Sequence, residues 1–148
     1  MKAPQFDLKG VDGKRYSPLS VRGDKGLLVM FICNHCPYVK RVIDGVVRNC
    51  KELAPLGIGS IAVMSNDPTD YPEDSFDNMK RVAREKGFPF PYVIDETQEV
   101  ARAYGTVCTP EFFGFDAALE LRYHGRFDEL FKAMQQIAAV GCSIKWRK

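Results

Sequence analysis

The feature that most restricts how this chain can fold is an apolar run that ends in two cysteines. Residues 27–32 are all apolar, and the motif Cys33-Asn34-His35-Cys36 follows them directly. Six consecutive apolar residues predict a central strand that is buried on both faces. Beyond the motif, apolar residues recur at spacings of three and four, which is typical of an amphipathic helix. They are Val39, Val42, Ile43, Val46, Cys50 and Leu53.

The order strand, C-x-x-C, helix has a chemical consequence for the two cysteines. The first N–H groups of a helix lack partners within the helix, and the helix dipole is positive at that end, so a thiolate is favoured there. We therefore expect Cys33 to titrate below a free thiol and to act as a nucleophile. Cys36, one turn later, would attack the mixed disulfide that Cys33 forms. Pro37 suits the first helical turn, where a missing N–H is tolerated.

A C-x-x-C motif could also be half of a structural zinc site, or an inert buried pair. A zinc site needs four ligands, which usually include a second close pair of cysteines or histidines. The sequence has no second pair. The other cysteines and the histidines are Cys50, Cys108, Cys142, His35 and His124. The redox interpretation is therefore favoured, and we expect no metal and no cofactor.

The overall composition restricts the class of protein further. The 148 residues suit a single domain, residues 1–148, and 45% hydrophobic with 27% charged residues is ordinary for a globular protein. The net charge is +2 and no basic cluster is present, so a nucleic-acid partner is not expected. No stretch resembles a signal peptide or a membrane span, so we expect a cytoplasmic protein without a membrane partner. In that compartment a C-x-x-C pair is more often catalytic than structural.

The rest of the chain predicts strands and helices that alternate around the first strand. Val11-Asp12-Gly13 between two short strand-like runs, 5–8 and 14–16, predicts an N-terminal hairpin. Further strands are predicted at residues 58–64, 92–94, 112–115 and 119–124, and helices at residues 76–87, 96–105 and 130–141, followed by a tail at 142–148. The first two long strands are expected to be parallel because a helix connects them.

A polar loop, residues 65–74, follows the second of these strands. Ligands in open α/β sheets bind beyond the carboxyl ends of parallel strands, and both Cys33 and Asn66 follow such ends. We therefore expect this loop to form one wall of the site, with Asn66 available to bind substrate. In the alternative interpretation, Asn66 makes turn hydrogen bonds and Asp74 or Ser75 caps the next helix.

A second point of interest is Thr109-Pro110, which precedes a predicted strand. A proline cannot donate to a central ladder, so Pro110 is a candidate cis-proline next to the cysteine pair. Cys108, beside it, is either a third redox thiol or a packing residue. Cys50 lies on the helical stripe and is expected in the core. For Cys142, in the tail, a resolving role is the less favoured alternative.

The predicted elements resemble the thioredoxin fold over nearly the whole chain, from Ala3 onward. The resemblance is to the TlpA/ResA-like and peroxiredoxin-like (AhpC/TSA) branch, which carries an N-terminal β-hairpin and a central strand-helix insertion. It rests on the C-x-x-C motif and on Thr109-Pro110. It implies an α/β architecture with three layers, α/β/α, around a mixed central sheet.

The resemblance also implies roles for the matching residues. In that family the first cysteine is the attacking nucleophile, the second resolves, and the proline is cis, which carries over to Cys33, Cys36 and Pro110. The residue before the proline, here Thr109, offers its backbone to the bound substrate.

The two residues between the cysteines, Asn34 and His35, are also assigned to the site. Asn34 is expected to bind substrate. His35 stands directly before the second cysteine, which is similar to the C-P-H-C of DsbA proteins. There an imidazole beside the thiolate stabilises the reduced form.

The expected function is a thiol-disulfide oxidoreductase that acts on disulfides and thiols of proteins or small molecules, with thioredoxin reductase or glutathione as reductant. The alternative is a thiol peroxidase acting on peroxides, because peroxiredoxins have T-x-x-C-P with the peroxidatic cysteine where Cys36 stands. Peroxiredoxins also carry an arginine where this chain has Cys108-Thr109, which argues against that activity. A Sco-type copper protein would use Cys33, Cys36 and His124, although such proteins space their cysteines as C-x-x-x-C.

Overall fold

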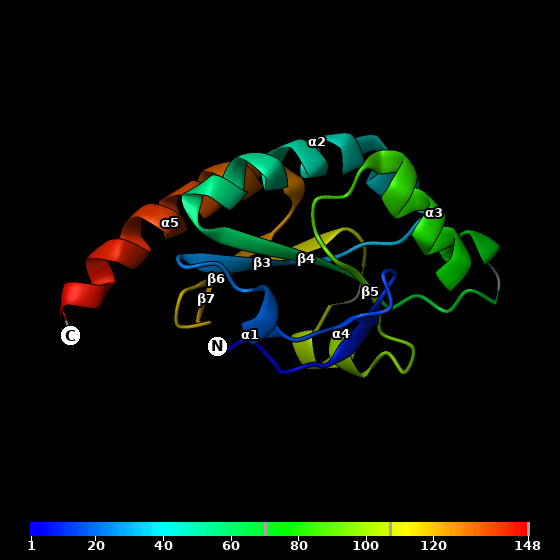
Figure 1. Cartoon of the computed structure of the whole chain (residues 1–148), viewed down its shortest axis with the longest axis horizontal. Helices are drawn as coiled ribbons and strands as arrows, with labels where there is room; N and C mark the ends of the chain where they lie inside the picture. The colour runs from blue at the N-terminus through cyan, green and yellow to red at the C-terminus, as the bar shows by residue number, and fades with distance from the viewer. Residues whose placement is uncertain (70, 107, 148) are drawn as a thin grey trace.

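The computed structural model of the chain describes residues 1–69, 71–106 and 108–147, with side chains up to residue 139. Figure 1 shows strands alternating with helices along the chain. The strands are β1 Leu8–Gly10, β2 Arg15–Tyr16, β3 Gly26–Phe31, β4 Ile58–Met64, β5 Tyr92–Ile94, β6 Glu111–Asp116 and β7 Leu121–Gly125. The α-helices are α1 Pro18–Val21, α2 Pro37–Leu53, α3 Phe76–Lys86, α4 Glu99–Tyr104 and α5 Leu130–Arg147, and short 3-10 helices are η1 Ala54–Leu56, η2 Pro72–Asp74 and η3 Phe127–Glu129.

The described strands form one seven-stranded mixed sheet in the order β2-β1-β5-β4-β3-β6-β7. β3 lies at its centre, parallel to β4 and antiparallel to β6. Each of its residues is buried, because both of its faces are covered. The prediction that the first two long strands are parallel is therefore confirmed, as is the N-terminal hairpin of β1 and β2.

Helices cover both faces of the sheet, which gives three layers. α2, α3 and α5 lie over one face, and α1 and α4 lie over the other (Figure 1). Alternate residues of β3 enter the two resulting cores, Leu28 and Met30 on the side of α2 and α5, and Leu27, Val29 and Phe31 on the side of α4. The predicted α/β architecture is confirmed.

The polar segment between β5 and α4 departs from the prediction. The helix was expected to begin after Asp95, but α4 begins at Glu99. Asp95 is buried, and its carboxylate accepts hydrogen bonds from the backbone N–H groups of Val100 and Ala101 at 3.3 and 2.9 Å. The Asp95 side chain, which lies before α4, therefore accepts hydrogen bonds from N–H groups in the first turn of α4 that have no partner within the helix.

Two predicted boundaries near the C-terminus are wrong. The last strand begins at Leu121, because Leu119 has a left-handed φ of 62° in the turn before it. The last helix was expected to end at Gly141, but α5 continues to Arg147, so no separate tail follows Cys142. A glycine within a helix costs about 1 kcal/mol relative to alanine and need not end it. Within the described part of the chain, no helix has both the length and the apolar character that crossing a membrane requires.

Cys50 confirms its predicted place in the core and gives a test of the packing. Its side chain is 4% exposed, and burial raises the pKa of the Cys50 thiol from 9.0 to about 11. Between these values the unfolded chain loses the proton while the folded chain keeps it, so unfolding becomes more favourable as pH rises. We expect this thiol to lower the free energy of unfolding by about 1 kcal/mol between pH 7 and pH 10.

Urea unfolding under reducing conditions at pH 7 and pH 10 measures this effect. The Cys50→Ala variant is the control, because it lacks the thiol and keeps every tyrosine that titrates in the same range. An equal loss of stability with pH in both proteins would show that the Cys50 thiol is not buried as described.

Candidate active site

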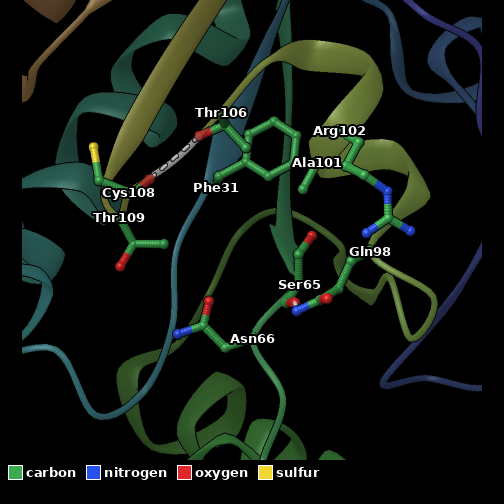
Figure 2. A pocket seen from close by; sticks show the side chains of 9 residues that line it. All are labelled: Phe31, Ser65, Asn66, Gln98, Ala101, Arg102, Thr106, Cys108 and Thr109. Carbon is green, nitrogen blue, oxygen red and sulfur yellow. Dashed lines mark hydrogen bonds between the residues drawn. The ribbon is translucent and has the colours of Figure 1, made fainter.

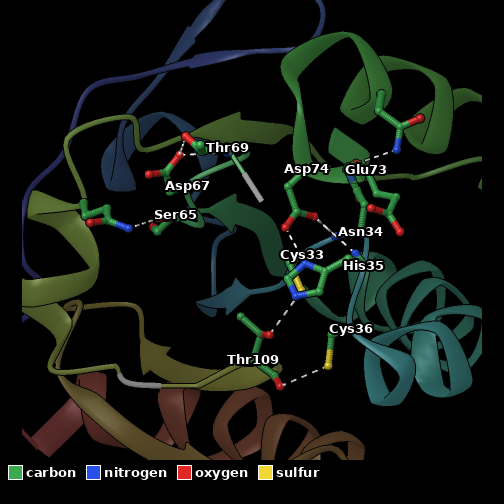
Figure 3. Close-up of polar contacts among 12 residues, drawn as sticks. Cys33, Asn34, His35, Cys36, Ser65, Asp67, Thr69, Glu73, Asp74 and Thr109 are labelled. Carbon is green, nitrogen blue, oxygen red and sulfur yellow. Dashed lines mark hydrogen bonds and ion pairs between the residues drawn. The ribbon is translucent and has the colours of Figure 1, made fainter. Parts of the chain in front are cut away.

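The cysteine motif meets the Thr109-Pro110 segment because two central strands are paired. The last residue of β3 lies opposite the first residue of β6, so the segments that follow and precede them are neighbours. The Cys33 sulfur lies 3.2 Å from the Thr109 hydroxyl oxygen, and the Cys36 thiol donates to the Thr109 carbonyl at 3.6 Å (Figure 3). The Thr109–Pro110 peptide bond is cis, and both cysteines are free thiols. One residue thus contacts both sulfurs.

The two thiols lie in different environments. α2 begins at Pro37, and the half-buried Cys36 is its N-cap residue. Cys33 lies before the helix and is 1% exposed. Burial raises the pKa of Cys33, and the hydrogen bonds with the Thr109 side chain and the Cys36 backbone do not offset this. The negative charge of Asp74 raises the same pKa further.

The expectation of a low pKa for Cys33 is therefore wrong, because the start of the helix lies at Cys36. The sequence does carry the signal that locates this start. Proline is over-represented at the first helical position, so Pro37 marks the preceding residue, Cys36, as the N-cap. At that position the free N–H groups and the dipole of α2 stabilise a negative charge.

Asp74 is fully buried and holds the loop between the cysteines. It belongs to the 3-10 helix η2. Its Oδ1 accepts hydrogen bonds from the backbone N–H groups of Asn34 at 2.6 Å and His35 at 3.2 Å. Its Oδ2 pairs with Nδ1 of the His35 ring (Figure 3). A buried carboxylate needs such donors, and here they are supplied by the motif itself.

Asp74 is the site residue that the sequence did not reveal. In the alternative interpretation of the polar loop, Asp74 or Ser75 caps the next helix, and Ser75 does so by accepting from the backbone N–H of Asn78 at 3.2 Å. Asp74 instead contacts a segment 39 or 40 positions earlier in the chain. A polar Pro-Glu-Asp turn indicates a helix start but gives no sign of such a distant partner.

The side chains of Asn34 and His35 are both held by the protein. The buried Tyr92 hydroxyl donates to Asn34 Oδ1 at 2.9 Å, and Asn34 Nδ2 donates to the Glu73 carbonyl at 2.8 Å. The His35 ring stacks on Tyr71, with ring centroids 3.8 Å apart and planes 11° from parallel. Asn34 is 8% exposed, so it positions the loop rather than presenting an amide at the surface.

Cys33, His35 and Asp74 are the residues that could hold a metal ion. Their ligand atoms all lie within 4.8 Å of one another, and thiolate with imidazole suits soft or borderline transition metals. No other such group occurs among the side chains that the structure describes, in residues 1–69, 71–106 and 108–139. His124 is not in it and instead pairs with Glu111. The copper ligand set that includes His124 is therefore not assembled.

Three further predicted site residues line one cavity. Asn66, Cys108 and Thr109 line a cavity of about 430 Å³ (Figure 2), and Thr109 also contacts both sulfurs of the cysteine pair. Cys108 is exposed, with its thiol 4.0 Å from a carboxylate oxygen of Glu111. The side chain of Cys142 lies outside the described residues.

Comparison with known proteins finds one matching family and several similar solved structures. The model of the AhpC/TSA family matches residues 1–124. The crystal structure of an uncharacterized conserved protein from Geobacillus kaustophilus is 48% identical, with a TM-score of 0.85, over 87% of this chain and 69% of that chain. A hypothetical protein from Sinorhizobium meliloti 1021 is 34% identical, with a TM-score of 0.83, over 86% and 70% of the two chains.

A more distant structure confirms the predicted fold. The thiol:disulfide interchange protein of the thioredoxin family from Chlorobium tepidum TLS is 21% identical, with a TM-score of 0.75, over 95% of both chains. At this identity the likeness establishes the thioredoxin fold and not an activity. No curated protein matches the chain in sequence.

The contacts of Asp74 predict a specific effect on stability. In the Asp74→Ala variant, the backbone N–H groups of Asn34 and His35 lose their acceptor in a buried site. We expect the free energy of unfolding to fall by about 2–4 kcal/mol, the usual cost of leaving buried donors unpaired. Urea unfolding of the reduced protein measures it. Asp67→Ala, which removes a carboxylate from an exposed turn, is the control, and equal stability of the two variants would contradict the described role.

Proposed function

The chain belongs to the AhpC/TSA family, and we propose that it is a thiol-disulfide oxidoreductase with Cys33 and Cys36 as its redox pair. The observation that carries the proposal is the position of Thr109, whose hydroxyl and carbonyl contact the two sulfurs. Both thiols are thereby held at one place, where the chain enters α2. A dithiol so placed can exchange two electrons with a substrate disulfide.

The difference between the two thiols supports an order of attack opposite to the one expected from the sequence. Cys36, half-buried at the N-cap, attacks one sulfur of the substrate disulfide. The bond between Cys36 and the substrate forms, the substrate S–S bond breaks, and the first substrate thiolate leaves. Cys33 then attacks the Cys36 sulfur, the Cys33–Cys36 disulfide forms, and the second substrate thiolate leaves. The substrate is reduced by two electrons and the pair is oxidised; the reverse sequence oxidises a dithiol.

Cys33 needs a proton acceptor for the second step. The raised pKa of Cys33 keeps its thiol protonated at neutral pH. The negative charge of the neighbouring Asp74 carboxylate disfavours the Cys33 thiolate. The His35 ring pairs with Asp74, and the ligand atoms of all three residues lie within 4.8 Å of one another. We assign the Asp74–His35 pair as the group that takes the Cys33 proton while Cys33 attacks. This gives His35 a role in the redox chemistry, as its place in the motif suggests.

The Thr109 carbonyl links the redox step to substrate binding. In the dithiol form it accepts the hydrogen bond of the Cys36 thiol. When Cys36 forms the mixed disulfide it no longer has a proton to donate, so the carbonyl becomes available to an N–H group of the bound substrate. This use of Thr109, beside Pro110, follows the role implied by the family resemblance.

The proposed partners are disulfides and thiols of proteins or small molecules. A reductant such as thioredoxin reductase or glutathione would return the pair to the dithiol form. Cytoplasmic location and a redox role for Cys108 stay predictions.

The order of attack can be tested by comparing the two cysteines directly. We expect Cys36 to react with iodoacetamide at pH 7.5 at least about tenfold faster than Cys33, because Cys33 is buried and its pKa is raised. Mass-mapped alkylation of the reduced protein measures both rates at once.

The activities of cysteine variants provide a second test of the order of attack. In an insulin-reduction assay, Cys36→Ser should lose activity entirely, and Cys33→Ser should accumulate a covalent complex with insulin through Cys36. Cys50→Ser is the matched control and should keep its activity if it folds. A covalent complex that forms through Cys33 in the Cys36→Ser variant would reverse the assignment.

Peroxide reduction is the second candidate, favoured by the half-buried Cys36 followed by Pro37 at the start of a helix. In that reaction the Cys36 thiolate attacks hydrogen peroxide and releases water, and Cys33 condenses with the resulting sulfenic acid and releases a second water. We expect Cys36 to consume peroxide no faster than free cysteine. Consumption faster by orders of magnitude, abolished by Cys36→Ser, would make peroxide the substrate instead.

A further inference from the structure

We infer that the cavity beside Thr109 binds a small, carboxylate-bearing thiol or disulfide of about tripeptide size, which makes such a compound the substrate of the redox pair. The reaction in this inference rests on the proposed function, whereas the binding site is inferred from the cavity alone. The cavity has a volume of about 430 Å³, within the range of sites for small ligands.

The position of the cavity connects it to the redox pair. Four segments surround it: the end of β3, the segment after β4, α4, and the segment before β6 (Figure 2). Thr109 lines the cavity, and its hydroxyl oxygen lies 3.2 Å from the Cys33 sulfur while its carbonyl accepts from Cys36. A ligand in the cavity therefore lies against the residue that both sulfurs contact.

The chemistry of the lining favours an anionic ligand with polar groups. Most lining side chains are polar, and none of them is a carboxylate. The charged one is Arg102, on α4, which lies near Gln98 and Ser65 across the cavity from Cys108 (Figure 2). The guanidinium of Arg102 donates to the Thr97 carbonyl at 2.7 Å through Nη2. Arginine has five N–H donors, so further donors remain for a ligand carboxylate.

Other lining groups are already anchored and set the shape of the cavity. Gln98 Nε2 donates to the Ser65 carbonyl at 2.9 Å, and the Ser65 hydroxyl donates to the buried Asp95 at 2.8 Å. These bonds fix the wall between β4 and α4, so the cavity is preformed. The amide of Asn66, on the same wall, can then bond a peptide-like group of the ligand.

The reaction with such a ligand follows the same two steps as the proposed function. Cys36 attacks the disulfide and displaces one ligand thiolate, and Cys33 displaces the second. Two electrons pass from the pair to the ligand disulfide, which becomes two thiols.

The test compares two disulfides that differ in their carboxylates. Glutathione disulfide carries carboxylates, and hydroxyethyl disulfide is neutral. Reduced protein is mixed with each disulfide, and formation of the Cys33–Cys36 disulfide is followed by acid quench and mass spectrometry. We expect Arg102→Gln to lower the apparent affinity for glutathione disulfide about tenfold or more, as loss of a charged hydrogen bond does, and to leave the rate with hydroxyethyl disulfide unchanged. Arg48→Gln, which removes the same charge from an exposed site on α2, should match the wild-type protein with both disulfides.

A binding measurement separates this inference from the proposed function. S-methylglutathione cannot react, and its binding to the reduced protein by calorimetry should be weakened by Arg102→Gln and not by Arg48→Gln. Suppose the protein reduces hydroxyethyl disulfide, but Arg102→Gln changes neither the reaction with glutathione disulfide nor the binding of S-methylglutathione. The cavity inference is then overturned and the redox function stands. If S-methylglutathione binds through Arg102 but no disulfide is reduced, the cavity site is supported and the redox function fails.

Discussion

The interaction on which the site depends is the burial of the Asp74 carboxylate beneath the cysteine motif. Among the described ion pairs, Asp74 has no lysine or arginine partner, and its donors are two backbone N–H groups and the His35 ring. A buried carboxylate with so few donors constrains the groups that supply them. The loop from Cys33 to Cys36 is therefore held in one conformation by a residue of η2, in the segment between β4 and α3.

The same carboxylate also separates the reactivity of the two thiols. Asp74 disfavours a negative charge on the buried Cys33, while Cys36 lies half-buried at the N-cap of α2. A pair with this asymmetry exposes one thiol to substrate and keeps the other protonated until it is needed. Thr109 completes the arrangement, because it contacts both sulfurs and also lines the neighbouring cavity.

Local patterns in the sequence predicted the fold more fully than the site. The apolar run at residues 27–32 and the apolar stripe that follows it depend on neighbours within a few residues, and both gave the right elements. The burial of Cys33 depends on elements far apart in sequence, and a C-x-x-C motif looks the same whichever cysteine caps the helix. The Asp74 contact likewise arises only when η2 folds back onto the motif. Pro37 is the local signal for the helix start, because proline favours the first helical position.

The central claim is that Cys33 and Cys36 form one two-electron couple. Its most direct test is equilibration of the protein with a series of dithiothreitol redox buffers, followed by alkylation and peptide mass mapping. The account predicts that both thiols disappear together in a single two-electron transition, with a disulfide between Cys33 and Cys36 in the oxidised form. A Cys33 that stays alkylatable after unfolding while Cys36 is oxidised, or a disulfide from Cys36 to another cysteine, would contradict it.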